Sequence, residues 1–342
     1  MGSPPPARPR LVDVAQAAGV STATASLVLR GRPGPSGAAR ESVHAAAARL
    51  GYRPDRNASL LAARRTHLLG VLFDVSSPFH AELVTALDEA AGEHGLDLVL
   101  STVTGRRDEA GAADLLLDFR CEGLVILGPT LKRSALVDLG GRCPTVVVGR
   151  SGTGPVTGVL ASDRVGLELA VDHLARLGHR QIAYVDGPPG SIATARRRGY
   201  RQAMRHHGLD GEIDIVAGGV TESAGASTAH AVLGRPRRQR PTALIAYNDR
   251  CAIGARDVIM RHGIEIPEGL SIIGYDDSPP ARLGTVDLTS ISQDPVGLAR
   301  ATVATLARSF DGEAVAQGSS RHTDVVISPR LVIRGSTGPV SA

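Results

Sequence analysis

The chain has 342 residues, of which 42% are hydrophobic and 21% charged, and this composition excludes a disordered chain and allows two or three domains. Cys121, Cys143 and Cys251 are far apart, which excludes a disulfide framework or a cysteine zinc site and favours a reducing, cytoplasmic compartment. The net charge is +4, and the charged residues are unevenly distributed along the chain. The proline-rich start, MGSPPPARPR, does not fit a signal peptide, and no later stretch is long and apolar enough for a membrane span.

The positive charge is concentrated near the N-terminus. Residues 1–66 carry ten Arg against Asp13, Glu41 and Asp55, a net charge of +7, so the other 276 residues sum to −3. A small basic segment on a mildly acidic body favours contact of that segment with a polyanion. A basic face that is merely solvated is the alternative that charge alone leaves open.

Three short helices are predicted in the basic segment. The first begins at Leu11 and ends at Gly19, Ser21 is placed to cap a second helix over 22–29, and Ser36 is placed to cap a third that ends at Gly51. The connection GVS has three residues and contains Gly, which predicts a helix-turn-helix. The third helix should cover the first two with an apolar stripe of Val43, Ala46, Ala47 and Leu50.

The second helix is predicted to enter the major groove of DNA. A recognition helix presents small or polar side chains from its first turn, and Thr and Ala contact thymine methyl groups while Ser and Thr bond base edges. A helical hairpin that packs on the body and binds nothing is the alternative. The residues assigned to the major groove are Ser21, Thr22, Ala23, Ser26, Leu27 and Arg30.

The segments LVDVAQAAGVSTATASLVL and RPGPSGAARESVHAAAARLGYRPDRNASLLAARRT resemble the headpiece and hinge of the lac-repressor (LacI/GalR) family of bacterial transcriptional regulators. The resemblance is dense over 11–66 and looser to residue 336. It implies a hinge helix over 57–66 that folds on the operator and inserts Leu61 between base pairs from the minor groove. Because Leu60 stands beside it, an ordinary helix-face leucine is the alternative. The residues assigned to this contact are Asn57, Ala58, Leu61, Ala62 and Arg64.

The headpiece departs from the family pattern at two positions. Leu27 stands where the family often has arginine, and Ala23 offers no hydrogen bond to a base. Base discrimination is therefore expected to depend on Thr22, Ser26 and DNA shape, with Arg30 on a phosphate. The operator sequence cannot be carried over from other members.

After Thr66 short apolar runs alternate with helical stretches such as HAELVTALDEAAGEHG. This spacing predicts βαβ units and buried parallel sheets in two doubly wound lobes, which bind ligands at the carboxyl ends of their strands. The expected strands are LLGVLFDV, LDLVLSTV, CEGLVILGP, CPTVVVGR and TGVLASD, then QIAYVDGP, EIDIVAGG, TALIAYND, LSIIGYDD, TSISQD and RLVIRGS.

Polar residues follow several of these strands, where a carboxylate with Asn, Arg and Gln supplies donors and acceptors for a small polyol. For each residue alone, turn formation or helix capping is the alternative. LASDRVG, RRRGYRQAM, AYNDRCAIGA and IIGYDDSP are similar to landmarks of the family's periplasmic-binding-protein-like effector domain. The resemblance implies that the matching Arg, Asn and first Asp hold the effector. The predicted effector-binding residues are Asp74, Phe79, Arg196, Asn248, Asp276 and Gln293.

The effector implied by the resemblance is a sugar. Val220 stands where relatives often have an aromatic residue, and the chain has no Trp, so a sugar derivative, a nucleoside or another small polar metabolite stays open. Asp163 is interpreted as a connector or cap and His179 as structural. Inducer and corepressor are both compatible with the sequence.

The predicted architecture is an all-α helix-turn-helix headpiece followed by an α/β effector domain with two doubly wound parallel-sheet lobes. The expected ranges are a tail over 1–10, the headpiece over 11–56, the hinge over 57–66, the effector domain over 67–336 (N-lobe 67–165 and 293–328, C-lobe 166–290) and a tail over 337–342.

Other classes of function fit the sequence less well. The chain has no G-x-G-x-x-G after a strand, no phosphate-binding loop with Lys-Ser/Thr, no G-x-S-x-G and no His pair on one helix face, so we expect no enzyme, no cofactor and no metal. A solute-binding protein would need an export signal and no basic head. The expected partners are a pseudo-palindromic DNA operator, a small-molecule effector and a second copy in a homodimer, since no heptads follow for a larger assembly.

Overall fold

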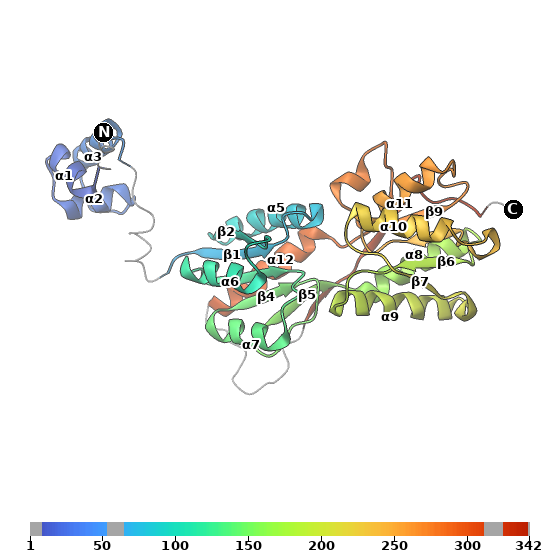
Figure 1. Cartoon of the computed structure of the whole chain (residues 1–342). Helices are drawn as coiled ribbons and strands as arrows, with labels where there is room; N and C mark the ends of the chain where they lie inside the picture. The colour runs from blue at the N-terminus through green and yellow to red at the C-terminus, as the bar shows by residue number, and fades with distance from the viewer. Residues whose placement is uncertain (1–8, 53–64, 311–323, 341–342) are drawn as a thin grey trace. The chain divides into compact units, whose positions relative to one another are not determined.

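The computed structural model describes residues 9–52, 65–310 and 324–340, and the chain divides into two compact units, residues 1–66 and 67–342 (Figure 1). The predicted hinge helix falls almost wholly on residues 53–64, so Asn57, Ala58, Leu61, Ala62 and Arg64 lie outside the described residues. In the part of the chain that is described, no single helix is long and apolar enough to cross a membrane; the helices Leu11–Ala18 and Thr22–Leu29 reach that length only as a pair bent by 103°.

The described residues of the first unit form three helices, α1 (Leu11–Ala18), α2 (Thr22–Leu29) and α3 (Gly37–Leu50). Gly19 and Gly51 end α1 and α3 in the left-handed region, with φ of 67° and 63°, which a residue without Cβ adopts at no steric cost. A small core joins the three helices through Val14, Ala15, Ala25, Val28, Val43, Ala46 and Ala47. Leu50, predicted to belong to this stripe, is instead 37% exposed because the helix ends there.

The second unit contains two six-stranded sheets, one in each lobe. The N-lobe sheet has the order β11-β5-β4-β3-β1-β2 with all neighbours parallel. Its strands are β1 (Leu68–Phe73), β2 (Asp97–Thr102), β3 (Gly123–Leu127), β4 (Thr145–Val148), β5 (Thr157–Ala161) and β11 (Val325–Ile327). Its helices are α5 (Pro78–Glu93), α6 (Glu109–Asp118), α7 (Arg133–Arg142) and α12 (Pro295–Phe310).

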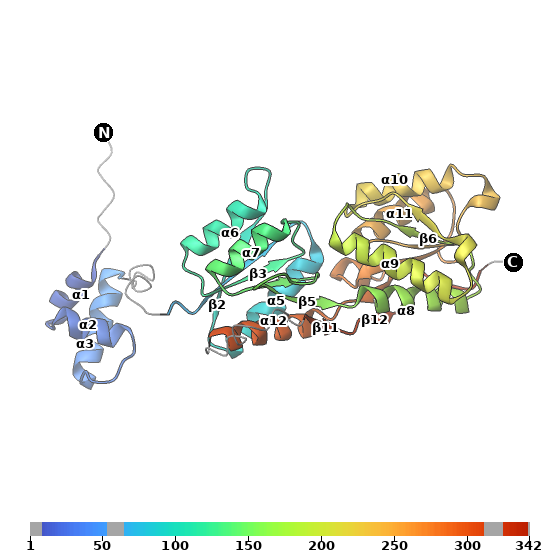
Figure 2. The ribbon, with the colours of Figure 1, turned by 90° about the horizontal axis from the view of Figure 1, so that it is seen from below.

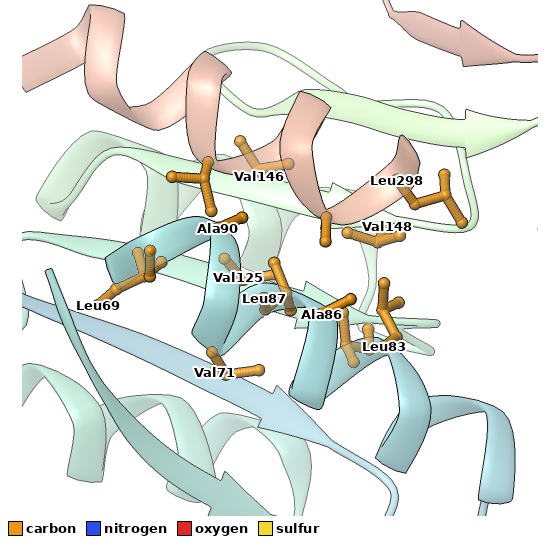
Figure 3. Packing of buried hydrophobic residues seen from close by; sticks show 14 of the residues in the cluster. Leu69, Val71, Leu83, Ala86, Leu87, Ala90, Val125, Val146, Val148 and Leu298 are labelled. Atoms are coloured by element: carbon orange, nitrogen blue, oxygen red, sulfur yellow. The ribbon is translucent and has the colours of Figure 1, made fainter. Parts of the chain in front are cut away.

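Helices cover both faces of the N-lobe sheet, as parallel sheets require. On one face α5 and α12 lie side by side, and Leu83 and Leu87 of α5 and Leu298 of α12 pack against Val125 and Val146 of the strands (Figure 3). On the other face α6 and α7 pack through a second apolar cluster. β11, a strand of only three residues, was not among the expected strands.

The C-lobe sheet has the order β12-β10-β9-β8-β6-β7, and only β12 is antiparallel. Its strands are β6 (Ile182–Val185), β7 (Asp214–Val216), β8 (Ala243–Ile245), β9 (Ser271–Asp276), β10 (Thr289–Ser292) and β12 (Arg330–Val332). Its helices are α8 (Asp163–Arg176) and α9 (Ser191–His206) on one face, α10 (Glu222–Leu233) and α11 (Asp249–Arg261) on the other, and the 3-10 helices η1 (Asp210–Glu212), η2 (Arg237–Gln239) and η3 (Pro279–Arg282) (Figure 2).

Residues 337–340, predicted to begin a tail over 337–342, pack against this lobe. The His179 ring lies 3.0 Å from the carbonyl oxygen of Gly338, and the backbone N–H of Val340 donates to the oxygen of Leu177. The His173 ring lies 2.9 Å from the hydroxyl of Thr337. These contacts join residues that are far apart in the sequence, so no local sequence pattern predicts them.

Candidate functional site

The second helix of the headpiece presents one face to solvent. Ala25 and Val28 are buried in the headpiece core, whereas the residues on the opposite side of α2 are exposed or half-buried. Because a helix turns once in 3.6 residues, this arrangement follows from the spacing of the apolar positions. The predicted major-groove residues are exposed at Ser21, Thr22, Ala23, Leu27 and Arg30 and half-buried at Ser26.

The start of this helix is fixed by its cap. The Ser21 hydroxyl accepts a hydrogen bond from the backbone N–H of Thr24 at 3.1 Å and lies 2.9 Å from the Thr24 hydroxyl. Ser21 therefore has a capping role in addition to the predicted contact with DNA. The 103° bend between α1 and α2 lies within the range of helix-turn-helix motifs.

A cleft of about 1050 Å³ lies between the two lobes of the second unit. It is open at the carboxyl ends of β1, β8, β9 and β10, where ligands bind in doubly wound sheets. All six predicted effector residues line it: Asp74, Phe79, Arg196, Asn248, Asp276 and Gln293.

Arg196, on α9, is the central cation of the cleft and is only 5% exposed. Its Nε donates to Asp163 at 3.0 Å, another guanidinium nitrogen donates to the Tyr247 carbonyl oxygen, and its guanidinium carbon lies 3.6 Å from the centre of the Tyr275 ring. Burial alone would lower the pKa of Arg196, but the nearby Asp163 carboxylate raises it well above its usual value. The guanidinium is therefore a fixed positive charge on the cleft wall.

Asp163 has a larger role than the predicted connector or cap. Ser162 caps α8, and Asp163 is the first residue of that helix, where it is buried. Its carboxylate accepts hydrogen bonds from both Arg196 and the Tyr275 hydroxyl, the latter at 2.9 Å. Asp163 is thus the counter-ion that orients Arg196, a pairing across 33 residues that sequence alone does not disclose.

Asp276 and Gln293 form a second polar group in the cleft. Gln293 Nε2 donates to Asp276 Oδ1 at 2.7 Å, so the amide of one strand end orients the carboxyl of the next. Burial raises the pKa of Asp276 to about 8, an effect that the Arg196 charge opposes and the Asp249 carboxyl reinforces. With its backbone at a φ of 111°, Asp276 holds a conformation that is uncommon for a residue with Cβ and typical of functional sites.

Asn248 and Asp74 also have local roles that compete with ligand binding. The side-chain oxygen of Asn248 caps α11 by accepting from the N–H of Cys251, and its amide donates to the carbonyl oxygen of Val220. Asp74 accepts from the N–H of Ser76 in the turn after β1. Both side chains line the cleft, yet part of their hydrogen-bonding capacity is already used.

Comparison with known proteins decides the family. Residues 10–55 match the family described as bacterial regulatory proteins, lacI family, and residues 171–337 match a periplasmic binding protein-like domain. The HTH-type transcriptional regulator GalR of Escherichia coli (strain K12) is 33% identical over 338 residues, 96% of each chain. This chain belongs to the LacI family.

Solved structures of LacI-family proteins share its architecture. A LacI transcriptional regulator from a Rhodococcus species is 42% identical, with a TM-score of 0.73 over 80% of this chain and 99% of that chain. The lac repressor dimer bound to operator and the anti-inducer ONPF is 28% identical, with a TM-score of 0.81 over 97% of this chain and 100% of that one. The protein is accordingly a DNA-binding transcriptional regulator, and the match over residues 10–55 sets aside a solute-binding protein without a DNA role.

In this LacI-family chain, the predicted site did not include several titratable residues of the cleft wall, among them His80. His80, on α5, accepts the backbone N–H of Asp74 at its Nδ1, at 3.1 Å, which leaves the ring proton on Nε2. Burial lowers the pKa of His80 to about 4 against the opposing effect of Asp74, so the ring is neutral at pH 7. The only available signal was its position after SSPF. Across residues 9–52, 65–310 and 324–340, no group of three His, Cys, Asp or Glu side chains is arranged to hold a metal ion.

Two arginines of the C-lobe reach across to the N-lobe. Arg282 of η3 makes a two-pronged ion pair with Glu82 of α5, at 2.8 and 3.1 Å. Arg250 of α11 donates to the carbonyl oxygen of Ser76 at 3.0 Å while Glu222 holds its other nitrogens. These contacts join the lobes beside the cleft.

Proposed function

We propose that the protein is a homodimeric transcriptional repressor whose affinity for a pseudo-palindromic operator is controlled by a small polar effector in the interlobe cleft. The observation that carries the proposal is that one chain joins a helix-turn-helix with an exposed second helix to a cleft with a fixed cation and an oriented carboxyl. The lac repressor of similar fold was solved as a dimer with operator and an anti-inducer, which supports this combination.

The headpiece supplies the contact with DNA. Its second helix lies in the major groove with Thr22, Ala23, Ser26 and Leu27 toward the bases and Arg30 toward the backbone. The net charge of +7 over residues 1–66 supplies the attraction to phosphates. The hinge over 57–66 adds a minor-groove contact in which Leu61 unstacks a base step.

The effector is a sugar or a sugar derivative. Arg196 donates, Asp276 and Gln293 offer both acceptors and donors, and neutral His80 donates from Nε2, a set that suits the hydroxyl groups of a polyol. Phe79, 8% exposed and on the cleft wall, contributes an apolar surface for a ring face. The polar groups serve binding rather than catalysis.

Effector binding changes the operator affinity by changing the arrangement of the two lobes. A ligand between the lobes favours the arrangement in which both lobes contact it, and the hinge segments of a dimer follow the N-lobes. A ligand shifts this equilibrium only by its difference in affinity for the two arrangements. A regulator that acts on bacterial DNA works in the cytoplasm.

The proposal is tested by measuring operator binding and sugar binding on the same preparations. Leu61→Ala should weaken operator binding by at least about tenfold, the scale of losing an inserted side chain, and leave sugar binding unchanged. Gln293→Ala should abolish the response to sugar and leave operator binding in its absence unchanged. If a panel of sugars and sugar derivatives neither binds nor alters operator affinity, the effector assignment is wrong.

A further inference from the structure

The face of α2 that is predicted to lie in the major groove contains an exposed leucine, Leu27, which does not pack in the headpiece core. Leu27 is 42% exposed and is not among the buried or partly buried side chains that form that core. It follows Ala23 by one helical turn, on the side of α2 opposite the buried Ala25 and Val28. Single exposed apolar side chains are ordinary on protein surfaces, so the place of Leu27 on the face assigned to the major groove, rather than its exposure, is what suggests a partner.

The rest of α2 offers no strong hydrogen-bonding reader of bases. Its sequence, TATASLVL, has no Arg, Lys, Asn or Gln, the residues that bond guanine or adenine in pairs. The Ser21 and Thr24 hydroxyls are engaged in the cap. Base discrimination by this helix therefore has to include apolar contact.

A leucine discriminates sharply among base edges in the major groove. Guanine, adenine and cytosine present acceptors or donors there, and covering these with a leucine removes water without replacing its hydrogen bonds. Thymine alone presents an apolar group, its 5-methyl. A leucine in contact with that methyl gains burial, and in contact with any other base it loses hydration.

We propose that Leu27 is a specificity-determining residue that selects thymine in each operator half-site through contact with the 5-methyl group. This inference rests on the proposed function, because it requires α2 to lie in the major groove. The +7 charge of residues 1–66 makes DNA, rather than a protein surface, the partner that complements this face.

The test uses full-length protein and the duplex recovered by selection from a random pool. Each thymine of that duplex is replaced in turn by deoxyuridine, which removes only the 5-methyl group. At one thymine per half-site the wild type should bind about fourfold more weakly, the factor that corresponds to one buried methylene-sized group. Leu27→Ala should bind the parent duplex more weakly and show no further loss at that thymine.

Val12→Ala is the matched control, because Val12 is an exposed apolar residue of α1 at 45%. It should retain the full deoxyuridine penalty. Leu27→Arg gives an independent measurement, since an arginine bonds guanine in pairs and should replace thymine by guanine at that position of the selected sequence.

The outcomes separate this inference from the proposed function. If the wild type recovers no duplex, the proposed function and the inference both fail. If a duplex is recovered but Leu27→Ala shows the same penalty as the wild type at every thymine, DNA reading stands and the role of Leu27 is overturned. An unchanged affinity of Leu27→Ala for the parent duplex would equally overturn it and would place the partner of this leucine outside DNA.

Discussion

Replacing Asp276 by asparagine should stabilise the protein and impair its regulation at the same time. Burial raises the pKa of this carboxyl to about 8, far above its value of 3.8 in an unfolded chain. The unfolded state therefore loses this proton near pH 4, whereas the folded state keeps it until about pH 8. Stability from this group is full below pH 4 and falls as the pH rises toward 8.

The size of the effect follows from the linkage between pKa and free energy. A pKa that differs by one between the folded and unfolded states corresponds to about 1.4 kcal/mol, so the difference of about 4 for Asp276 sets an upper bound of about 6 kcal/mol. We expect Asp276→Asn to gain at least about 2 kcal/mol of unfolding free energy at pH 8, because water entry and local rearrangement relieve part of the cost of the buried charge. Near pH 4 the gain should vanish. The new side chain still accepts the Gln293 amide, so no buried donor loses its partner.

Urea unfolding at a series of pH values measures this directly. Four of the five tyrosines, Tyr184, Tyr200, Tyr247 and Tyr275, are buried in the C-lobe, and with no Trp in the chain their near-ultraviolet signal reports unfolding of that lobe. Asp257→Asn is the control, because its carboxyl is 58% exposed. If the Asp276→Asn and wild-type curves run parallel from pH 4 to pH 8, burial does not control this carboxyl and the reasoning is refuted.

Three further predictions concern the lobes and the headpiece. Glu82→Gln removes the ion pair with Arg282, which is partly exposed at both ends and worth up to about 1 kcal/mol. Calorimetry should therefore find sugar binding two- to fivefold weaker, and an unchanged affinity would show that this contact does not join the lobes in solution. Truncation after Ser336 removes the contacts of Gly338 with His179 and of Val340 with Leu177. Urea unfolding should find the free energy of unfolding lower by about 2 to 3 kcal/mol, and an unchanged urea midpoint would show that these residues do not stabilise the lobe. Operator affinity measured by fluorescence anisotropy should fall at least about tenfold between about 50 and 200 mM salt, and a flat response would argue against phosphate contact.

Local signals predicted the secondary structure well. The three headpiece helices begin and end where Ser21, Ser36, Gly19 and Gly51 indicated, because caps and left-handed glycines act within a single turn of the chain. The expected strands are all present, since a buried parallel strand is a continuous apolar run. β11 was missed because three residues are too few to form a recognisable run.

Pairing over long distances in sequence could not be predicted. The sequence contains Asp163 and Arg196 but does not say that they meet, and the same holds for His179 and Gly338. Asp276 acquires its raised pKa only from the packing of several strand ends. Strand-end position together with the resemblance to the LacI family predicted six side chains that line one cleft, but neither describes what each of them contacts.

We conclude that this LacI-family protein reads a specific DNA sequence as a dimer. Selection of duplexes from a random pool with the purified full-length protein, with and without a panel of small metabolites, tests it most directly. We expect enrichment of a pseudo-palindrome with a flexible step at its centre, where Leu61 would insert. Failure to enrich any duplex under either condition, or enrichment of a single asymmetric half-site, would contradict it.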